Sequence, residues 1–294
     1  MSKKNGAHSF IFGCGDVGRR IAKTLILSDV QAGDIQGFVN SSKSLEQARS
    51  FGISSDIIDL DEAALNLSNC QRSQLYYTVA PQKNGCQDLR SRRVISEFTL
   101  HGIRPEKVVL ISTTGVYGDC QGQWVTEQSD VKPQTERGKR RLDSENQWID
   151  WGDSSGVDVV VLRVPGIYAF SRLPRERIMS GTPVVRSSEC GYTNRIHADD
   201  LARICVTAMQ KGVAREVYNV TDGTPGKISE FLQAAAQVLN YPALPEISMS
   251  QAKTQLSSGM LSYLSESRKI SNKKMLEALG IELLYSNFRD GLLN

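Results

Sequence analysis

The chain has 294 residues, 40% of them hydrophobic and 23% charged, which is enough to bury a substantial core. Its 35 basic and 32 acidic residues leave a net charge of +3, which gives no general reason to expect nucleic-acid binding. No apolar run approaches the roughly 20 residues needed to span a bilayer, so we expect no membrane-embedded segment.

Two further features bear on where the protein works. The first ten residues, MSKKNGAHSF, are basic but lack the apolar stretch of a secretory signal. The six cysteines are scattered, with no C-x-x-C pair and no histidine at metal-ligand spacing: Cys14, Cys70, Cys86, Cys120, Cys190 and Cys205. This pattern favours reduced thiols over disulfides or a zinc site. We expect a cytoplasmic protein without a bound metal.

Residues 8–27 read as a short apolar strand, a glycine turn and an amphipathic helix. Gly13, Gly15 and Gly18 form G-x-G-x-x-G between strand and helix, the context in which this pattern indicates a dinucleotide site. The helix N-terminus offers N–H groups and a partial positive charge to a pyrophosphate. The predicted cofactor-binding residues of this turn are Gly13, Gly15, Asp16, Val17, Gly18 and Arg19.

The second predicted strand, residues 34–40, ends at Asn40 and runs into Ser41, Ser42 and Lys43, with no acid among these residues. A site that prefers NAD usually places Asp or Glu here to accept a hydrogen bond from the ribose 2′-OH. Hydroxyls, an amide and a lysine suit a 2′-phosphate instead, and Arg19 could reach it from the first turn of the preceding helix. We therefore predict NADP, with NAD as the alternative.

The alternation of strands and helices continues. Residues 54–60, 73–81 and 106–112 are the third to fifth predicted strands. Asp59 lies near the end of the third strand and is a candidate to accept from the adenine amino group. The loop after the fourth strand is predicted to pass beneath the cofactor with Val79, Ala80 and Pro81. This spacing predicts an α/β fold with a doubly wound parallel sheet and ligands at the carboxyl ends of its strands.

Several later segments carry a family resemblance. They are ISTTGVYGD at 111–119, LRVPGIYAFSR at 162–172, NRIHADDLA at 194–202, REVYNVTDG at 215–223 and RKISNKKMLEALGIEL at 268–283. In this order they resemble the extended short-chain dehydrogenase/reductase family, which includes NAD-dependent nucleotide-sugar epimerases and dehydratases. The resemblance covers nearly the whole chain and implies an NAD(P)-binding Rossmann fold.

The resemblance also identifies candidate catalytic residues. In the family, a Ser or Thr after the fifth strand hydrogen-bonds the substrate oxygen. Counting back from Val-Tyr-Gly at 116–118 places Thr113 at that position. The helix that carries the family's Tyr-x-x-x-Lys matches PQTERGKRRLDSE at 133–145, but the tyrosine position is Arg137 and the lysine position is Arg141. An arginine cannot exchange a proton usefully near pH 7. Arg137 suits clamping a carboxylate, phosphate or sugar oxygen, and Arg141 suits holding the nicotinamide ribose.

Three other side chains lie in segments that border the cleft in the family: Tyr117, Tyr168 and His197. His197 titrates in the right range for acid–base catalysis, so it is our further catalytic candidate. Its place before Asp199 equally suits a structural role at a helix start. Both tyrosines sit beside glycine turns, which favours packing roles.

Residues 166–195 and 222–268 interrupt the alternation and are expected to form a small substrate lobe. We predict a Rossmann core over 1–165, with 166–294 supplying the rest of the core, about 196–221, as well as the lobe and a C-terminal tail. The lobe arginines, Arg172, Arg175, Arg177 and Arg195, are either surface residues or recognise an anionic substrate.

Two functions follow from these observations. The first is an atypical NAD(P)-dependent oxidoreductase or epimerase/dehydratase for a small polar or nucleotide-sugar-like substrate. The second is an NADP-binding sensor or regulatory protein without turnover, which the replaced Tyr and Lys suggest. We expect a monomer or homodimer, a small-molecule substrate for which an anionic group is one of two alternatives, and no nucleic-acid or membrane partner.

Overall fold

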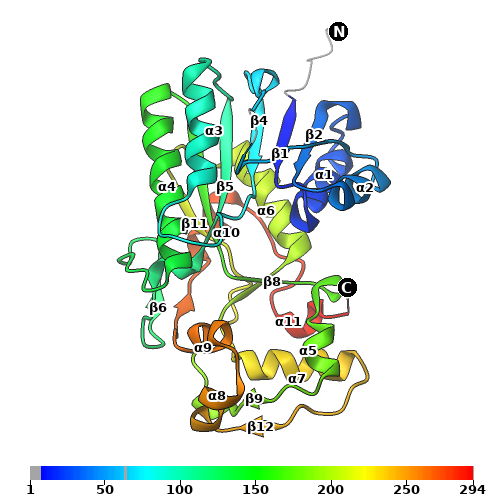
Figure 1. Cartoon of the computed structure of the whole chain (residues 1–294), viewed down its shortest axis with the longest axis vertical. Coiled ribbons are helices and arrows are strands. Elements are labelled where there is room, and N and C mark those ends of the chain that lie inside the picture. Colours follow the sequence, from blue (N-terminus) through cyan, green and yellow to red (C-terminus); the bar gives the residue numbers. More distant parts are fainter. Residues whose placement is uncertain (1–7, 63–64, 294) are drawn as a thin grey trace.

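The computed structural model describes residues 8–62 and 65–293. Residues 1–7, on which the expectation about a secretory signal partly rests, lie outside this described part. The chain forms a central sheet covered by helices on both faces, with a smaller lobe beyond the carboxyl ends of the strands (Figure 1).

The central sheet has seven strands, and every pair in it is parallel. In spatial order they are β11 (Val217–Asn219), β7 (Asp158–Val164), β5 (Lys107–Thr113), β4 (Gln74–Tyr77), β1 (Ser9–Phe12), β2 (Ile35–Val39) and β3 (Ser54–Ile57). β5 and β7 lie side by side and are almost continuous buried runs, as expected for strands covered on both faces. The predicted doubly wound parallel sheet is confirmed.

Helices cover the two faces in separate layers. Their bounds are α1 (Asp16–Leu27), α2 (Ser42–Ser50), α3 (Leu89–Leu100), α4 (Glu136–Ser155), α6 (Ala198–Lys211) and α10 (Lys273–Leu279). Leu25, Ile204 and Leu279 from α1, α6 and α10 pack with one face of the sheet in a single apolar core. Phe98 and Trp148 from α3 and α4 pack against the other. Burial of these two apolar layers stabilises the fold.

The lobe consists of short elements that come from distant parts of the chain. These are β8 (Gly166–Tyr168) paired with β10 (Arg195–His197), β9 (Val184–Val185) paired with β12 (Glu246–Ile247), α5 (Arg175–Met179), α7 (Ile228–Val238), α8 (Met249–Gln255), α9 (Ser258–Leu264) and α11 (Phe288–Gly291). β6 (Trp124–Val125) pairs with β13 (Lys269–Ile270) and brings the C-terminal segment back beside the core. The division at residue 165 stays a prediction.

Two searches of the described residues concern membranes and metals. None of their helices is long and apolar enough to cross a membrane. They also contain no group of three or more His, Cys, Asp or Glu side chains arranged to hold a metal ion. All six cysteines are free thiols, four of them buried.

Candidate functional site

The first part of the site is a cavity of about 400 Å³ at the carboxyl ends of β1 to β4. Strands β3 and β4 end earlier than the sequence predicted, at Ile57 and Tyr77. The residues beyond them leave the sheet and line this cavity. The predicted cofactor residues among the lining are Gly13, Gly15, Asn40, Asp59, Val79 and Ala80. Pro81 follows Ala80 but is not part of the lining.

The glycine turn has the geometry that a pyrophosphate site requires. Gly13 has a φ of +81°, and a Cβ there would lie 2.9 Å from the Thr78 hydroxyl. A Cβ on Gly18 would lie 3.0 Å from the Ile11 side chain, so glycine permits close packing of α1 on β1. A Cβ on Gly15 meets only one atom within 4 Å, at 3.8 Å, and so would occupy the open cavity.

The N-terminus of α1 is available to a ligand. No side chain caps this helix, so the N–H groups of its first turn lack the partners that other helices obtain from Ser, Thr or Asp. Free N–H groups beside a glycine that leaves room for a ligand fit a dinucleotide pyrophosphate. Val17 lies in this turn and is half-buried.

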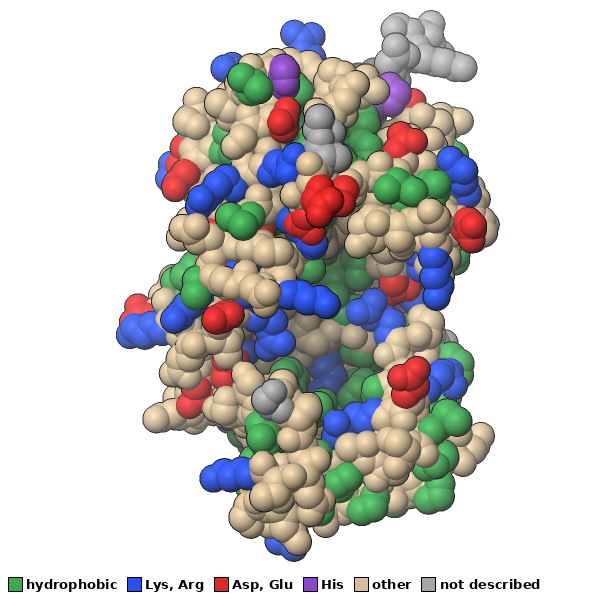
Figure 2. All heavy atoms as spheres, in the orientation of Figure 1, with side chains coloured by type: hydrophobic (Ala, Val, Ile, Leu, Met, Phe, Trp, Pro, Cys, Tyr) green, Lys and Arg blue, Asp and Glu red, His purple; other side chains and the backbone are tan. Residues whose placement is uncertain are grey.

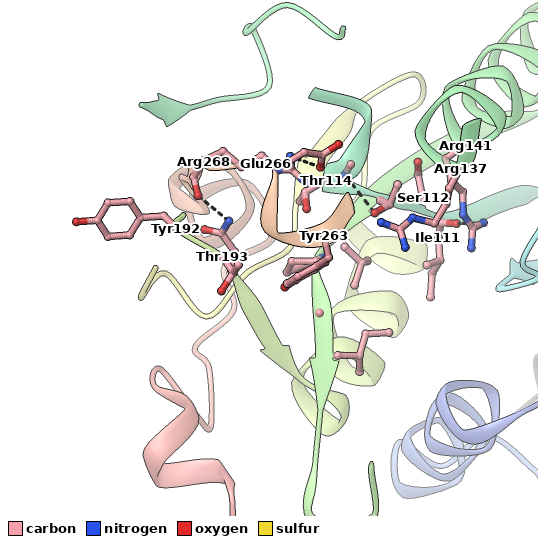
Figure 3. Close-up of a pocket in the computed structure, with 17 residues that line it drawn as sticks. Ile111, Ser112, Thr114, Arg137, Arg141, Tyr192, Thr193, Tyr263, Glu266 and Arg268 are labelled. Atoms are coloured by element: carbon pink, nitrogen blue, oxygen red, sulfur yellow. Dashed lines mark hydrogen bonds and ion pairs between the residues drawn. The ribbon is translucent and has the colours of Figure 1, made fainter. Parts of the chain in front are cut away.

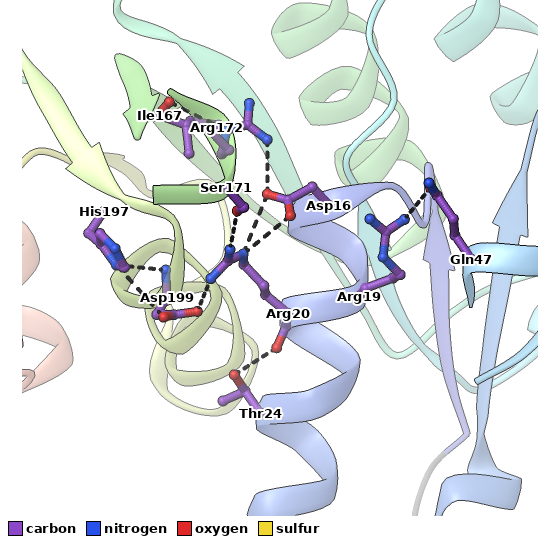
Figure 4. A network of polar contacts seen from close by, with 10 residues as sticks. All are labelled: Asp16, Arg19, Arg20, Thr24, Gln47, Ile167, Ser171, Arg172, His197 and Asp199. Atoms are coloured by element: carbon purple, nitrogen blue, oxygen red, sulfur yellow. Dashed lines mark hydrogen bonds and ion pairs between the residues drawn. The ribbon is translucent and has the colours of Figure 1, made fainter. Parts of the chain in front are cut away.

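Asp16 would repel a pyrophosphate if its charge were not balanced. Arg172 donates to its carboxylate over 2.9 Å, and Arg20 lies 3.4 Å from it. Arg20 also donates to Asp199 and to the hydroxyl of Ser171 (Figure 4). The two arginines therefore neutralise Asp16 and Asp199, and they connect the start of α1 to the loop after β8.

The polar run after β2 is only partly inside the cavity. Asn40 lines it, as does Ser44. Ser41 caps α2 by accepting from the Ser44 N–H, while Ser42 and Lys43 are exposed in the first turn. Arg19 points along α2 instead, where it lies 5.4 Å from the centre of the Phe51 ring and donates to Gln47. A 2′-phosphate at Asn40 would have the start of α2 beside it.

The second part of the site is a cavity of about 310 Å³ between the sheet edge and the lobe. Figure 2 shows a hollow at this level of the molecule with basic side chains around it. Thr113, Arg137 and Arg141 all line it, so the structure brings together three of the four candidate catalytic residues. Positions 137 and 141 share one face of α4 because they are four residues apart.

Arg141 connects the two cavities. Its Nη1 donates to the carbonyl of Val79 over 2.9 Å and to the carbonyl of Ile111 over 3.1 Å. Val79 lines the first cavity and Ile111 the second. Burial lowers the pKa of Arg141, and the neighbouring Arg137 contributes in the same direction. An arginine nevertheless remains charged, so Arg141 is a fixed cation where the two cavities meet.

Arg137 has no such ties. Its side chain is exposed to the second cavity and has no hydrogen bond or ion pair with any described residue. Figure 3 shows it projecting from α4 beside Arg141. We expected a buried Arg137 to pair with an acid, a carbonyl or a bound anion. Because Arg137 is exposed and has no partner within the described chain, its guanidinium is open to solvent and to any ligand in the cavity.

A buried polar network holds the floor of this cavity. Ser112 donates to Glu145, and Arg163 donates to both oxygens of the same carboxylate. Arg163 also donates to the Tyr117 hydroxyl, which in turn donates to Asn219 over 2.9 Å. Burial raises the pKa of Tyr117 although Arg163 opposes the shift. Tyr117 is therefore a structural residue, as its place beside a glycine turn indicated.

His197 is the one catalytic candidate that the structure does not bring to the cavity. Its side chain is 0% exposed, and its Nδ1 accepts from the Asp199 N–H at the start of α6. It packs between Tyr168 and Tyr285, with ring centres 5.2 and 4.1 Å away. A side chain enclosed in this way does not face the cavity, which favours the structural role at the helix start over the catalytic one. Tyr168 is also buried and does not line the cavity.

The lobe arginines are engaged within the protein and do not line the cavity. Arg172 pairs with Asp16, and Arg175 lies 4.7 Å from the centre of the Phe170 ring. Arg177 donates to the carbonyl of Pro183, and Arg195 is buried against Phe231. These contacts favour the structural alternative for all four.

Sequence reasoning missed the wall that the lobe contributes to this cavity. Its residues are Tyr192, Thr193, Asn194, Tyr263, Glu266 and Arg268. Asn194 fixes the approach of the C-terminal segment, since its side chain donates to the Arg268 carbonyl and accepts from the Ile270 N–H. These contacts span more than seventy positions in sequence, and no local pattern signals them.

Residues 89–221 match the NAD dependent epimerase/dehydratase family. This part of the chain is similar to that family. The match covers β5, the arginine-bearing helix α4 and β7, and it extends to the end of β11. The predicted resemblance to extended short-chain dehydrogenases/reductases is therefore confirmed at the level of the family.

The chain is also similar to two named relatives. The chain is 23% identical over 282 residues to protein YeeZ of Escherichia coli, covering 94% of this chain and 95% of YeeZ. It is 28% identical over 148 residues to protein y4nG of Sinorhizobium fredii, a match that covers 48% of this chain and only 36% of that longer protein.

Solved structures show the same fold. A functionally unknown conserved protein from Silicibacter pomeroyi has a TM-score of 0.84 at 26% identity, covering 98% of this chain and 97% of that one. UDP-glucuronic acid 4-epimerase from Bacillus cereus in complex with NAD has a TM-score of 0.75 at 16% identity, with 97% and 94% covered. The dTDP-glucose 4,6-dehydratase DesIV from Streptomyces venezuelae, with NAD bound, has a TM-score of 0.77 at 16% identity and the same coverage.

Proposed function

We propose that this protein is an NADP-dependent oxidoreductase or epimerase/dehydratase of atypical type, acting on a small polar substrate. The observation that carries the proposal is Arg141, whose Nη1 bonds the wall of each of two adjoining cavities. The glycine turn opens into one cavity, and Thr113 and Arg137 line the other. This is the arrangement that hydride transfer between a dinucleotide and a substrate needs.

The cofactor would lie along the carboxyl edge of the sheet. Gly13 to Gly18 and the first turn of α1 would hold the pyrophosphate. Asn40 and the start of α2, including Lys43, would bind the 2′-phosphate, and Asp59 would accept from the adenine. NAD is the alternative cofactor. When bound, the nicotinamide supplies or accepts a hydride, and Arg141 would donate to its ribose.

Thr113 is placed to polarise the substrate oxygen. Its hydroxyl oxygen accepts from the Gly115 N–H over 3.2 Å, which fixes the oxygen and leaves the hydroxyl hydrogen free to point at the cavity. A hydrogen bond to the reacting oxygen stabilises negative charge that develops there. Arg137 would hold a substrate oxygen or anionic group on the same wall.

Reduction of a carbonyl also requires a proton, which neither arginine can supply. Tyr117, Tyr168 and His197 are enclosed within the protein. Tyr263 lines the cavity, is half-buried, and has no hydrogen-bond partner among the described residues. We assign Tyr263 as the candidate proton donor, delivered by the lobe in place of the helix α4 tyrosine.

Substrate profiling with NADPH tests the proposal. The expected result for an oxidoreductase is consumption of NADPH with a sugar or hydroxy-carbonyl substrate. The expected result for an epimerase or dehydratase is conversion of the sugar without net change in the cofactor. Either activity should be strongly reduced in Tyr263→Phe and Thr113→Val. NADPH binding without turnover of any substrate would favour the second function, a cofactor sensor. The observation in favour of that alternative is the pair Arg137 and Arg141 on the helix face that meets the cavity.

The double variant Arg137→Tyr with Arg141→Lys separates the two functions further. Gain of reductase activity would show that the fold retains a competent site and lacks only its acid. No gain, with cofactor affinity unchanged, would indicate altered chemistry or a sensor. The cytoplasmic location and the monomeric or homodimeric state stay predictions.

A further inference from the structure

The cavity contains a buried carboxylate oxygen without a partner. Glu266 is 7% exposed and lines the cavity, and its Oε1 makes no hydrogen bond in the described structure. A buried oxygen without a partner has lost the hydrogen bonds that it would make with water, and this loss costs free energy. An ionised carboxylate only accepts hydrogen bonds, so the missing partner is a donor.

Glu266 is held in place by its neighbour. Its Oε2 accepts from Arg268 Nη1 over 2.7 Å, and the same Nη1 donates to the carbonyl of Gly118. This pair fixes the carboxylate at the start of the segment that returns to the core through β13. Oε1 is therefore held as an acceptor by a residue that lines the cavity.

The opposite wall has the complementary property. Arg137 and Arg141 lie across the cavity from Glu266 and Arg268 in Figure 3. Three arginines and one carboxylate line the cavity, so its walls carry an excess of positive charge. Arg141 is tied to two carbonyls, whereas Arg137 has no partner among the described residues. An anionic group of the ligand would pair with Arg137.

We propose that the substrate is a small anionic polyol, such as a sugar acid or sugar phosphate. Its anionic group pairs with Arg137, and one of its hydroxyls donates to Glu266 Oε1. This deepens the proposed function and rests on it. A hydroxyl suits Glu266 better than an ammonium group does, because Arg268 already balances the carboxylate charge.

The size of the cavity agrees with this substrate class. Its volume of about 310 Å³ stands at the low end of the range of roughly 300–1,000 Å³ for small-molecule sites. One sugar ring with an anionic substituent suits this volume better than a whole nucleotide sugar does. Tyr263 and Thr113 on the cavity walls would then face the ring carbons between the two anchored ends.

Calorimetry on NADPH-saturated protein tests the proposal with four probes: glucuronate, galacturonate, glucose 6-phosphate and glucose. We expect at least one anionic sugar to bind about tenfold or more tightly than glucose, and the carboxylate and phosphate probes distinguish the two anion types. Arg137→Gln should remove most of that preference. Glu266→Gln should weaken binding of the anionic sugar about tenfold or more. The new amide N–H₂ cannot accept a hydrogen bond from the sugar hydroxyl, which must turn away or lose its partner.

Matched controls separate binding from folding. Glu277→Gln and Arg92→Gln make the same changes at exposed residues outside both cavities and should leave sugar affinity unchanged. Thermal unfolding checks that Glu266→Gln is folded. Glu266→Asp provides a second test. It keeps the negative charge but shortens the side chain by one methylene, so the carboxylate oxygen lies farther from the ligand and binding should also weaken.

Three results would overturn the substrate assignment. They are equal affinity for glucose and every anionic sugar, no binding of any probe to the NADPH-loaded protein, and unchanged affinity in folded Glu266→Gln. Failure of the proposed function looks different. Sugar binding that persists in a protein unable to bind NADPH or NADH would refute the oxidoreductase and leave the substrate assignment standing.

Discussion

Arg163 and Glu145 form a buried ion pair directly beneath the candidate substrate cavity. Arg163 Nη2 lies 2.7 Å from Glu145 Oε2, and Nε lies 3.2 Å from both carboxylate oxygens. The same carboxylate accepts from Ser112, the residue before Thr113. The pair therefore positions the end of β5, on which the proposed chemistry depends.

Glu145→Ala should be strongly destabilising. It leaves the Arg163 guanidinium buried without its counter-ion, which costs about 3–5 kcal/mol of unfolding free energy. Urea unfolding measures this loss. As a control, Glu145→Leu combined with Arg163→Met removes both charges and should cost much less. A single variant within about 1 kcal/mol of the wild type would contradict the account.

Two glycine substitutions should separate folding from cofactor binding. Gly15→Ala places a methyl group in the first cavity, so NADPH affinity should fall about tenfold or more with little change in stability. Gly13→Ala forces an L-alanine into the left-handed backbone conformation, with a φ of +81°. This should cost about 1–2 kcal/mol or more of stability. Calorimetry and urea unfolding on both variants check the contrast. Equal NADPH affinity in Gly15→Ala and wild type would refute the pyrophosphate position.

Asn40→Asp should reverse the cofactor preference. A carboxylate at Asn40, which lines the first cavity, would accept from the ribose 2′-OH of NADH and repel the 2′-phosphate of NADPH. We expect the ratio of NADPH to NADH affinity to fall about tenfold or more. The exposed Asn240, which lies outside both cavities, provides the control substitution Asn240→Asp. An unchanged ratio would place the 2′-phosphate elsewhere.

Asp222 should make the fold less stable as the pH rises. Burial raises the pKa of this carboxyl to about 7, and its Oδ2 has no hydrogen-bond partner. Because the folded state holds the proton more tightly than the unfolded state, the stabilisation is complete below about pH 4 and is lost as the pH rises to about 7. Asp222→Asn should equal the wild type near pH 4 and exceed it near pH 8 in urea unfolding. A variant less stable than the wild type at the higher pH would contradict this.

Much of the core could be predicted from the sequence because its signals are local. Gly13, Gly15 and Gly18 lie within six positions, and the apolar runs of β1 to β5 alternate with helices at regular spacing. Thr113, Arg137 and Arg141 could be placed together because a family pattern fixes their positions on β5 and α4. Their meeting in one cavity agrees with that placement.

The lobe side of the site could not be predicted in the same way. Glu266 reaches the cavity because β13 pairs with β6 and Arg268 bonds Gly118, contacts between residues about 150 positions apart. The burial of His197 could not be predicted for a related reason. Its position in sequence puts it near the cleft, but Tyr168 and Tyr285, which enclose it, come from different parts of the chain. Burial of a polar side chain depends on such distant contacts.

The central claim is that a dinucleotide binds across the two cavities that Arg141 connects. Calorimetric titration of the purified protein with NADPH and with NADH tests it most directly. The account predicts saturable binding at one site per chain, tighter for NADPH, and weakened in Gly15→Ala. Absence of saturable binding for both dinucleotides would contradict it.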